Sequence, residues 1–462
     1  MPPQPGLLGP NPPATRSRPP LRRHLRSVVR PPFADVPGPF RRARVDTSIE
    51  EQATAQQERG MRAFWWDGFW ASACDSIALN YFGLYLLAFG ASASQVGLLS
   101  SLSSLFAAVA FIPGAALAER VRGRKTLVLV TGGGIARLAL LAVAAVPFVA
   151  HGGAAIWLLI GIASFRGFWG QFAIPAWTSL TADVVPIGIR GRFLASRNFG
   201  MSIATLAVAP VAGFLIDAFT GFGGWQLVWL MAFVAGAIST WFYSRIPEPA
   251  PHAAVAELPQ RQEDAGLWRD LLGDRNLLTY LGSVALWNVA LQVAGPFFNV
   301  YLDQELGAST AMIGFIIAVP SITGLIALPW IGRMMDERGT KWLMVVTGLT
   351  IPALPAAWLL VTAPWQVVPL NVASGVLWAG YHLATMNLIM VMAPAAKRAR
   401  YAAAFQTVTF AASFAGPLLG GLVIEHIGFH AIFALSAIGR LAATGVLLRV
   451  DGAPREPHPS PA

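Results

Sequence analysis

The chain has 462 residues, of which 55% are hydrophobic and only 12% are charged, and its mean hydropathy is +0.56. A water-soluble fold cannot bury that much apolar surface, so the composition excludes a soluble domain and indicates an integral membrane protein. The net charge of +10 comes from Arg and Lys residues in the first 60 residues and in segments that flank apolar runs. We therefore expect a lipid bilayer as the chain's environment and no nucleic-acid partner.

The first 60 residues differ in composition from all that follows. Prolines alternate with arginines throughout residues 1–60 and no long apolar run interrupts them. This pattern predicts a disordered cytoplasmic tail without a signal peptide, attracted to anionic lipid headgroups. An organelle transit sequence, or a translation start at Met61, would explain the same segment.

Twelve apolar stretches follow, each long enough for the roughly 20 residues that cross a ~30 Å hydrocarbon layer. We predict helices, because lipid offers no partner for backbone polar groups and the runs are too long for barrel strands. The distribution of these stretches predicts four further parts of the chain: an N-terminal bundle (61–246), a cytoplasmic linker (247–278), a C-terminal bundle (279–450) and a cytoplasmic tail (451–462). The expected spans are 63–89, 93–118, 126–148, 154–180, 194–219, 224–245, 279–302, 311–335, 341–361, 367–392, 403–427 and 429–449.

The two halves repeat each other. Two sets of residues recur, at displacements of 217 and 208 residues respectively: Gly90, Ala91, Ser92 and Gly97 in the first set, and Pro186, Arg190 and Arg192 in the second. Several secondary transporters are built from two such halves in parallel register, with the substrate path between them.

Basic residues mark alternate connections between the spans. The segments after spans 2, 4, 6, 8 and 10 are basic, whereas the others contain no Arg or Lys, namely those near Gly90, His151, Gly221, Glu305, Pro364 and Gly428. By the positive-inside bias, both termini lie in the cytoplasm. We expect the plasma (inner) membrane as the location.

Several kinds of chemistry are excluded by what the sequence lacks. Cys74 is the only cysteine, so there is no disulfide framework and no thiolate metal cluster. No Walker sequence occurs, which excludes ATP as the direct energy source. We predict no enzymatic activity, no cofactor and no metal site.

Four charges lie deep within predicted spans: Asp75, Arg137, Arg166 and Arg440. An ionisable group at that depth costs at least about 2.5–3.5 kcal/mol and suggests a functional role. If Asp75 meets Arg166 or Arg137, protonation of the carboxylate would break the pair and couple proton movement to rocking of the halves. A permanent ion pair that holds the N-terminal bundle together is the alternative. Arg440 can instead extend its side chain toward the cytoplasm.

A loop motif occurs in both halves. Its copies are Gly332, Asp336, Gly339 and Lys341 after span 8, and Gly114, Glu119, Arg120, Gly123, Arg124 and Lys125 after span 2. The copy after span 8 resembles the helix 2–3 loop signature of the major facilitator superfamily. The copy after span 2 has Glu in place of Asp and a longer spacing. The resemblance implies a cytoplasmic latch that closes in the outward-facing state, with Asp336 near the start of helix 5 and Glu119 near the start of helix 11. A plain turn with solvated charges is the alternative.

Two further stretches resemble this superfamily. Arg166 and Gly170 are similar to its fourth-helix Arg-x-x-x-Gly motif, which is linked there to proton transfer. Its antiporters also carry a Pro-Gly stretch in helix 5. Here the fuller version lies in helix 11 and a weaker one in helix 5: Gly416, Pro417, Gly420 and Gly421, and Ala209, Pro210 and Gly213.

Polar side chains on spans 1, 7 and 10 are candidates for the substrate path. Asn288, Gln292 and Asn299 share one face of span 7, which Pro296 interrupts. Amides facing lipid would be costly, so this face should line a cavity or another helix. The resemblance implies that helices 1, 4, 7 and 10 line the path. We predict a substrate cavity lined by Asn80, Asn288, Gln292, Asn299, Trp378, Tyr381 and His382.

The sequence therefore predicts an all-α integral membrane protein with twelve transmembrane helices in two six-helix, pseudo-symmetric halves, as in the major facilitator superfamily fold. We expect a monomeric secondary active transporter of a small organic solute, working by alternating access as a proton-coupled antiporter for efflux of an amphipathic compound. One alternative is uptake or exchange of an organic anion, clamped by Arg137 and Arg166. Another is a membrane receptor or scaffold that has lost transport.

Overall fold

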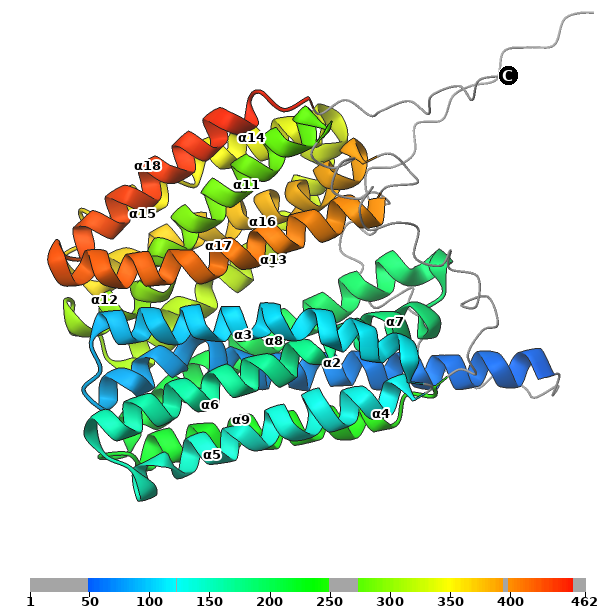
Figure 1. Cartoon of the computed structure of the whole chain (residues 1–462), viewed down its shortest axis with the longest axis horizontal. Helices are drawn as coiled ribbons and strands as arrows, with labels where there is room; N and C mark the ends of the chain where they lie inside the picture. The colour runs from blue at the N-terminus through cyan, green and yellow to red at the C-terminus, as the bar shows by residue number, and fades with distance from the viewer. Residues whose placement is uncertain (1–48, 122, 249–272, 394–397, 452–462) are drawn as a thin grey trace, which may run out of the picture. The chain divides into compact units, whose positions relative to one another are not determined.

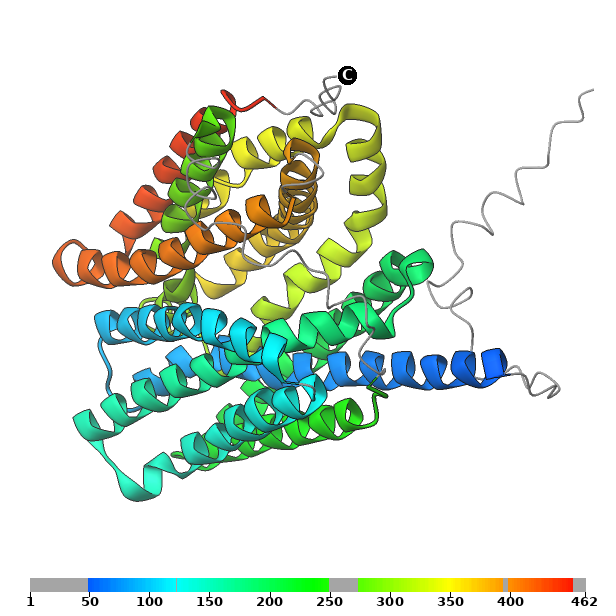
Figure 2. The ribbon, with the colours of Figure 1, turned by 45° about the vertical axis from the view of Figure 1, so that its right-hand side comes forward.

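The computed structural model describes residues 49–121, 123–248, 273–393 and 398–451, and nearly all of them are helical. The predictions for residues 1–48, for most of the linker and for residues 452–462 lie outside the described residues. Helices from the two halves form two groups, coloured blue to green and green to red (Figures 1 and 2).

The N-terminal half contains the six predicted spans, two of them divided. Its elements are α2 (Ile49–Ala88), α3 (Ala93–Arg120), α4 (Arg124–Val128), the π-helical segment η1 (Leu129–Ile135), α5 (Ala136–Val149), α6 (Gly152–Phe172), α7 (Ile174–Val184), α8 (Ile187–Ala218) and α9 (Gly223–Ser244). The third span is the continuous run from α4 through η1 to α5, and the fourth is α6 followed by α7.

The C-terminal half repeats this plan. Its elements are α11 (Arg275–Ala294), the 3-10 segment η3 (Gly295–Phe297), α12 (Phe298–Gln304), α13 (Thr310–Arg338), α14 (Thr340–Thr350), α15 (Ala353–Trp358), the 3-10 segment η4 (Pro364–Gln366), α16 (Val367–Met392), α17 (Arg398–His426) and α18 (Phe429–Leu447). The segment η3 contains Pro296 and interrupts span 7 where we expected a break, because Pro cannot donate the helix hydrogen bond.

Two helices begin earlier in the chain than the predicted spans. The helix α2 begins at Ile49, inside the predicted tail 1–60, and α11 begins at Arg275, inside the predicted linker 247–278. The first turns of α2 are rich in Glu, Gln and Ala, which favour helix without forming an apolar run. The α11 start is capped by Asp274, whose carboxylate accepts hydrogen bonds from the backbone N–H groups of Asn276 and Leu277 at 3.1 and 3.2 Å.

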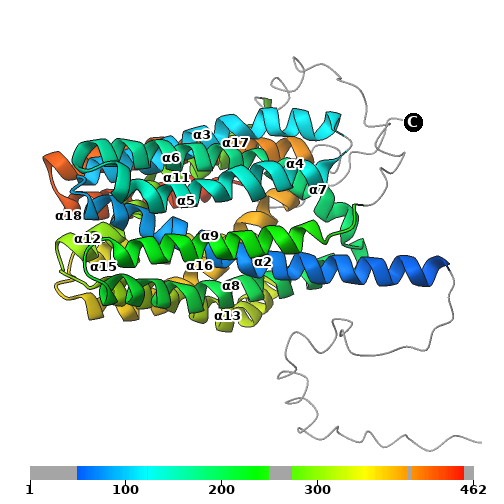
Figure 3. The ribbon, with the colours of Figure 1, turned by 90° about the horizontal axis from the view of Figure 1, so that it is seen from below.

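Helix packing follows the sequence repeat. The helix α2 packs against α8 and α9, as α11 packs against α17 and α18, and the pair α3–α6 corresponds to the pair α13–α16. Between the halves, α3 packs against α17 and α8 against α13, as Figures 1 and 3 show. The predicted twelve-helix, two-half fold is confirmed.

Nine helices or continuous runs of helical segments in the described residues have the length and hydropathy of membrane spans. The remaining spans are α2, the divided pair α14–α15, and α16. Among these, α2 carries Asp67 and Asp75 within its length, which lowers its hydropathy without shortening it.

Candidate functional site

Asp75 of α2 lies between two arginines from neighbouring helices. Its Oδ1 accepts a hydrogen bond from Arg137 Nη1 of α5 at 2.9 Å and another from Arg166 Nη2 of α6 at 2.5 Å. The arginine side chains are only 14% and 19% exposed, whereas that of Asp75 is 44% exposed. We expected Asp75 to pair with Arg166 or Arg137. In the structure both arginines pair with the same carboxylate oxygen.

This arrangement leaves the cluster with a net positive charge and unused donors. Arg137 Nη1 also donates to the buried Cys74 Sγ at 2.9 Å. The Nε groups of Arg137 and Arg166 have no hydrogen-bond partner within the described residues. The Asp75 side chain is nearly half exposed, and protonation of its carboxylate would remove the charge that holds both guanidinium groups.

The π-helical segment η1 positions Arg137. It contains Gly132 to Gly134, and Thr240 Oγ1 of α9 donates to the carbonyl of Gly133 at 3.1 Å. Two residues after η1, Arg137 crosses α9 at Gly236, where an added Cβ would lie 2.6 Å from Arg137 Cδ. Such insertions shift the register of the helix that follows and often occur at functional sites.

Sequence reasoning missed a second buried pair on α2. Asp67 and Arg197 are both buried, with Arg197 Nη2 3.7 Å from Asp67 Oδ2, and Ser239 Oγ donates to Asp67 Oδ1 at 2.7 Å. The Arg197 guanidinium also lies 4.6 Å from the centroid of the Phe64 ring. Both charges fall near predicted span ends, where charges are ordinary. The available signal was the spacing, because Asp67 precedes Asp75 by two helical turns on one face.

The two halves are joined at one end of the bundle. We call this the neutral end, since it holds the connections without Arg or Lys, and the other the basic end. Asp217 of α8 accepts hydrogen bonds from the backbone N–H groups of Thr310 and Ala311 at the start of α13, at 3.1 and 2.7 Å. Glu425 of α17 accepts one from Ser92 Oγ at the start of α3, at 3.3 Å. Each acidic side chain thus stabilises the positive end of a helix in the opposite half.

The Pro-Gly stretches of helices 5 and 11 lie in this same contact. An added Cβ at Gly97 of α3 would lie 2.5 Å from the carbonyl oxygen of Pro417. An added Cβ at Gly314 of α13 would lie 2.6 Å from that of Ala209. Gly97 and Gly314 occupy equivalent positions in the two halves. The interface therefore contains two equivalent close helix crossings, α3 with α17 and α13 with α8.

The predicted cavity residues fall into two groups. In the first, Asn299 Nδ2 donates to the backbone oxygen of Asn80 at 3.4 Å, which joins α12 to α2 across the halves. Asn288 donates to the carbonyl of Val284 in its own helix, and Gln292 packs against Gly416 of α17. Asn299 and Gln292 thus face other helices, one of the two placements that we predicted for this stripe.

The second group is aromatic and lies on α16. Trp378 has ring contacts with Tyr381 and His382, at centroid distances of 5.7 and 5.2 Å. Tyr381 is buried and stacks on Trp287 of α11 at 4.4 Å, so it belongs to the C-terminal core, whereas His382 is exposed. No hydrogen bond or ring contact among the described residues joins this group to the amides.

The second-half gate motif forms the predicted tight turn. Gly339 has a φ of +87°, a conformation that favours glycine, and it ends α13 and precedes α14. Asp336 is exposed and has no ion pair within the described residues, and an added Cβ at Gly332 would meet no atom within 4 Å. Lys341 Nζ donates to the carbonyl of Leu448 at 3.4 Å. The predicted approach of Asp336 to helix 5 is not formed in this structure.

The first-half motif is held within its own half. Arg124 pairs with Asp183 of α7 at 2.8 Å, and the backbone N–H of Lys125 donates to Glu248 at 3.3 Å. An added Cβ at Gly114 would lie 2.4 Å from the carbonyl oxygen of Phe172. Arg120 is exposed and Gly123 precedes α4. The side chain of Glu119 lies outside the described residues.

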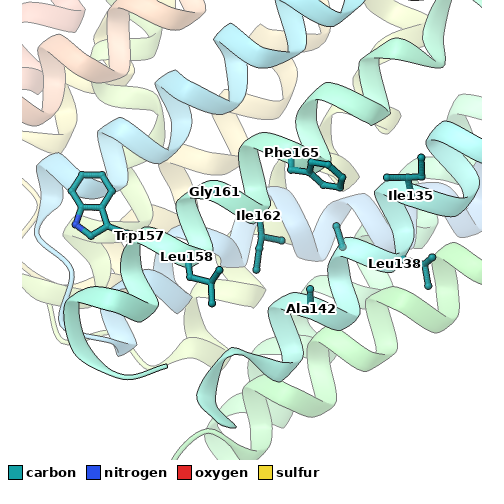
Figure 4. A pocket seen from close by; sticks show the side chains of 9 residues that line it. Ile135, Leu138, Ala142, Trp157, Leu158, Gly161, Ile162 and Phe165 are labelled. Atoms are coloured by element: carbon teal, nitrogen blue, oxygen red, sulfur yellow. The ribbon is translucent and has the colours of Figure 1, made fainter. Parts of the chain in front are cut away.

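A separate groove of about 560 Å³ opens between α5 and α6 (Figure 4). All of its lining residues are apolar: Ile135, Leu138, Ala139, Ala142, Trp157, Leu158, Gly161, Ile162 and Phe165. Exposed apolar side chains between two spans are typical of a surface in contact with lipid. This groove therefore presents a mainly apolar surface.

The sequence profile of the Major Facilitator Superfamily matches residues 68–302 and 288–462. The chain belongs to the major facilitator superfamily. It is therefore a multi-pass membrane protein that acts as a secondary transporter of a small-molecule substrate. It is not an enzyme. Multidrug resistance protein MdtG of Dickeya zeae is 23% identical to it over 398 residues, covering 84% of this chain and 93% of the relative. The protein of that name from Yersinia enterocolitica is 26% identical over 400 residues, covering 82% and 90%.

Solved transporters share this superfamily fold. The nucleoside transporter NupG aligns with a TM-score of 0.62 at 15% identity, covering 84% of this chain and 98% of its own. A bacterial homologue of the iron transporter ferroportin, in an inward-facing state, aligns with a TM-score of 0.65 at 15% identity, covering 87% and 99%. At these identities the likeness shows the fold alone.

The position of Arg137 yields a first prediction. In a Gly236→Ala variant, the added methyl group would displace Arg137 and loosen its pairing with Asp75. We expect an apparent loss of stability of about 1–3 kcal/mol, typical of overpacking, seen as a lower apparent Tm of the purified protein. Gly161→Ala is the matched control, because an added Cβ there meets no atom within 4 Å. Equal Tm values for the two variants would contradict this role of Gly236.

The acidic caps at the neutral end yield a second prediction. Loss of a helix cap costs about 1 kcal/mol, so the double variant Asp217→Ala, Glu425→Ala should shift the equilibrium toward an open neutral end about fivefold or more. Spin labels at His151 and Trp365, exposed positions in opposite halves at this end, would report the change in a Cys74→Ser background. A growing population of longer distances is expected. An unchanged distance distribution would show that the caps do not hold the halves together.

Proposed function

We propose that the protein exports an amphipathic compound in exchange for protons, with Asp75 as the proton carrier. The observation that carries this proposal is the half-exposed carboxylate of Asp75, shared between the buried guanidinium groups of Arg137 and Arg166. In its ionised form Asp75 draws α2 toward α5 and α6. A proton on Asp75 cancels that attraction and lets α2 move relative to the two helices.

The proton cycle follows from the orientation expected for the chain. The positive-inside bias places the basic end in the cytoplasm and the neutral end outside. The contacts that close the neutral end therefore correspond to an inward-facing state, the state named for the ferroportin homologue. In that state Asp75 has released its proton to the cytoplasm and is paired with the arginines. Substrate then binds from the cytoplasm and is released outside. A proton from outside next binds Asp75, and the protein returns to the inward-facing state.

The substrate class rests on two supports. The relatives from Dickeya zeae and Yersinia enterocolitica are named multidrug resistance proteins, although they are only 23% and 26% identical. The side chains predicted to line the path are amides and aromatic groups, which offer hydrogen bonds and apolar surface without selecting one charge. Both features suit an amphipathic compound.

The anion alternative is weakened by the same geometry. Arg137 and Arg166 already share one carboxylate, so an anion would have to compete with Asp75 for them. A receptor or scaffold without transport is the remaining alternative, and it requires that no solute flux occurs under any condition.

Removal of the Asp75 charge provides the test of this function. In everted vesicles with an imposed proton gradient, cationic, neutral and anionic compounds would be added in turn and the gradient followed. We expect one class to collapse the gradient with the wild-type protein and at least tenfold less with Asp75→Asn, because an amide cannot carry a proton.

The matched control is Glu305→Gln, which removes an exposed carboxylate without an ion pair in the described residues. It should retain exchange, since this side chain lies outside the charge cluster. Exchange that persists in Asp75→Asn would refute Asp75 as the proton carrier. The absence of exchange in the wild-type protein with every compound would favour the alternatives.

A further inference from the structure

Arg440 is a buried cation in the C-terminal half. It lies on α18, is 2% exposed, and its Nε and Nη2 have no hydrogen-bond partner within the described residues. The sequence left open that its side chain extends toward the basic end. Helix side chains lean toward the helix N-terminus, and the guanidinium carbon instead lies 5.9 Å from the ring centroid of Trp378 on α16.

No carboxylate compensates this charge. In the described C-terminal half, every acidic residue lies in a loop or within the last turn or cap of a helix: Asp274, Asp303, Glu305, Asp336, Glu337, Glu425 and Asp451. None of them forms an ion pair with Arg440. A buried guanidinium without a counter-charge is unfavourable, so a counter-charge from outside the chain would stabilise it.

A second orphan donor points to the same place. Trp287 of α11 is 3% exposed, and its Nε1 has no partner within the described residues. Its ring stacks on Tyr381 at 4.4 Å and lies 6.4 Å from Trp378. Three buried N–H donors, from α11 and α18, thus belong to side chains that lie beside Trp378 of α16 and have no acceptor within the described residues. Each unsatisfied buried donor is costly in a finished fold.

We propose that α11, α16 and α18 form a binding site for a small anion or a carboxylate group, with Arg440 as the charged ligand and Trp287 Nε1 as a neutral donor. The site lies in the opposite half from Asp75 and goes beyond the proton-coupled export proposed above. Trp378 also contacts the exposed His382 at 5.2 Å, which places the surface one aromatic ring away from the guanidinium.

Thermal stability of the purified full-length protein tests this site. The apparent Tm would be measured in methanesulfonate buffer while chloride, acetate or benzoate replaces methanesulfonate at constant ionic strength. We expect at least one of these anions to raise the Tm saturably, because a ligand that binds only the folded state stabilises it. A response to chloride alone would indicate an inorganic anion, and a larger response to acetate or benzoate a carboxylate.

Two variants decide whether Arg440 is responsible. Arg440→Gln should abolish the response, while Arg449→Gln, which removes an exposed arginine two turns along the same segment, should retain it. If Arg440→Gln does not fold, Trp287→Phe removes one donor without changing the charge and should raise the half-saturating concentration several-fold. The proposal fails if no anion shifts the wild-type Tm, if Arg440→Gln responds like wild type, or if Trp287→Phe leaves the midpoint unchanged.

Discussion

The pairing of one carboxylate oxygen with two arginines organises the N-terminal half. Asp75, Arg137 and Arg166 come from α2, α5 and α6, and the opposite charges lower the cost of holding one another among apolar spans. Local features follow from this need. The π-helical segment η1 sets the direction of Arg137, and Gly236 leaves space for its side chain. In the proposed cycle a proton on Asp75 abolishes this same contact, so that stability and switching both depend on one group.

The repeat explains both what the halves share and how they differ. The interface is built twice, since Asp217 and Glu425 are related by the 208-residue displacement, and Ser92 and Ser309 by the 217-residue displacement. Charge breaks this symmetry. The 217-residue displacement that relates Gly90 to Gly307 also carries Asp75 to Gln292, an uncharged amide. The C-terminal half therefore keeps a buried cation, Arg440, without a matching carboxylate in the described residues.

The spans and the central charge cluster could be predicted from sequence, because apolar length and the cost of a charge in lipid are local properties. Other features depend on tertiary contacts. The α2 helix begins at Ile49 because its first turns contain polar helix-forming residues. The Asp67–Arg197 pair forms because α2 and α8 pack side by side. The proximity of Asp217 to α13 likewise needs the docked halves, since nothing near Asp217 in sequence announces a helix cap.

The remaining question is how a proton on Asp75 could alter contacts at the neutral end. The helix caps and glycine crossings there contain no group that Asp75 touches, so the effect must pass through α2. Tyr81 lies six residues after Asp75, donates to the carbonyl of Ala209, and would meet an added Cβ at Gly314 at 2.5 Å. Asn80, beside it, accepts from Asn299 of the other half. One continuous helix thus joins the proposed proton site to the interface, and a shift of α2 would change both together.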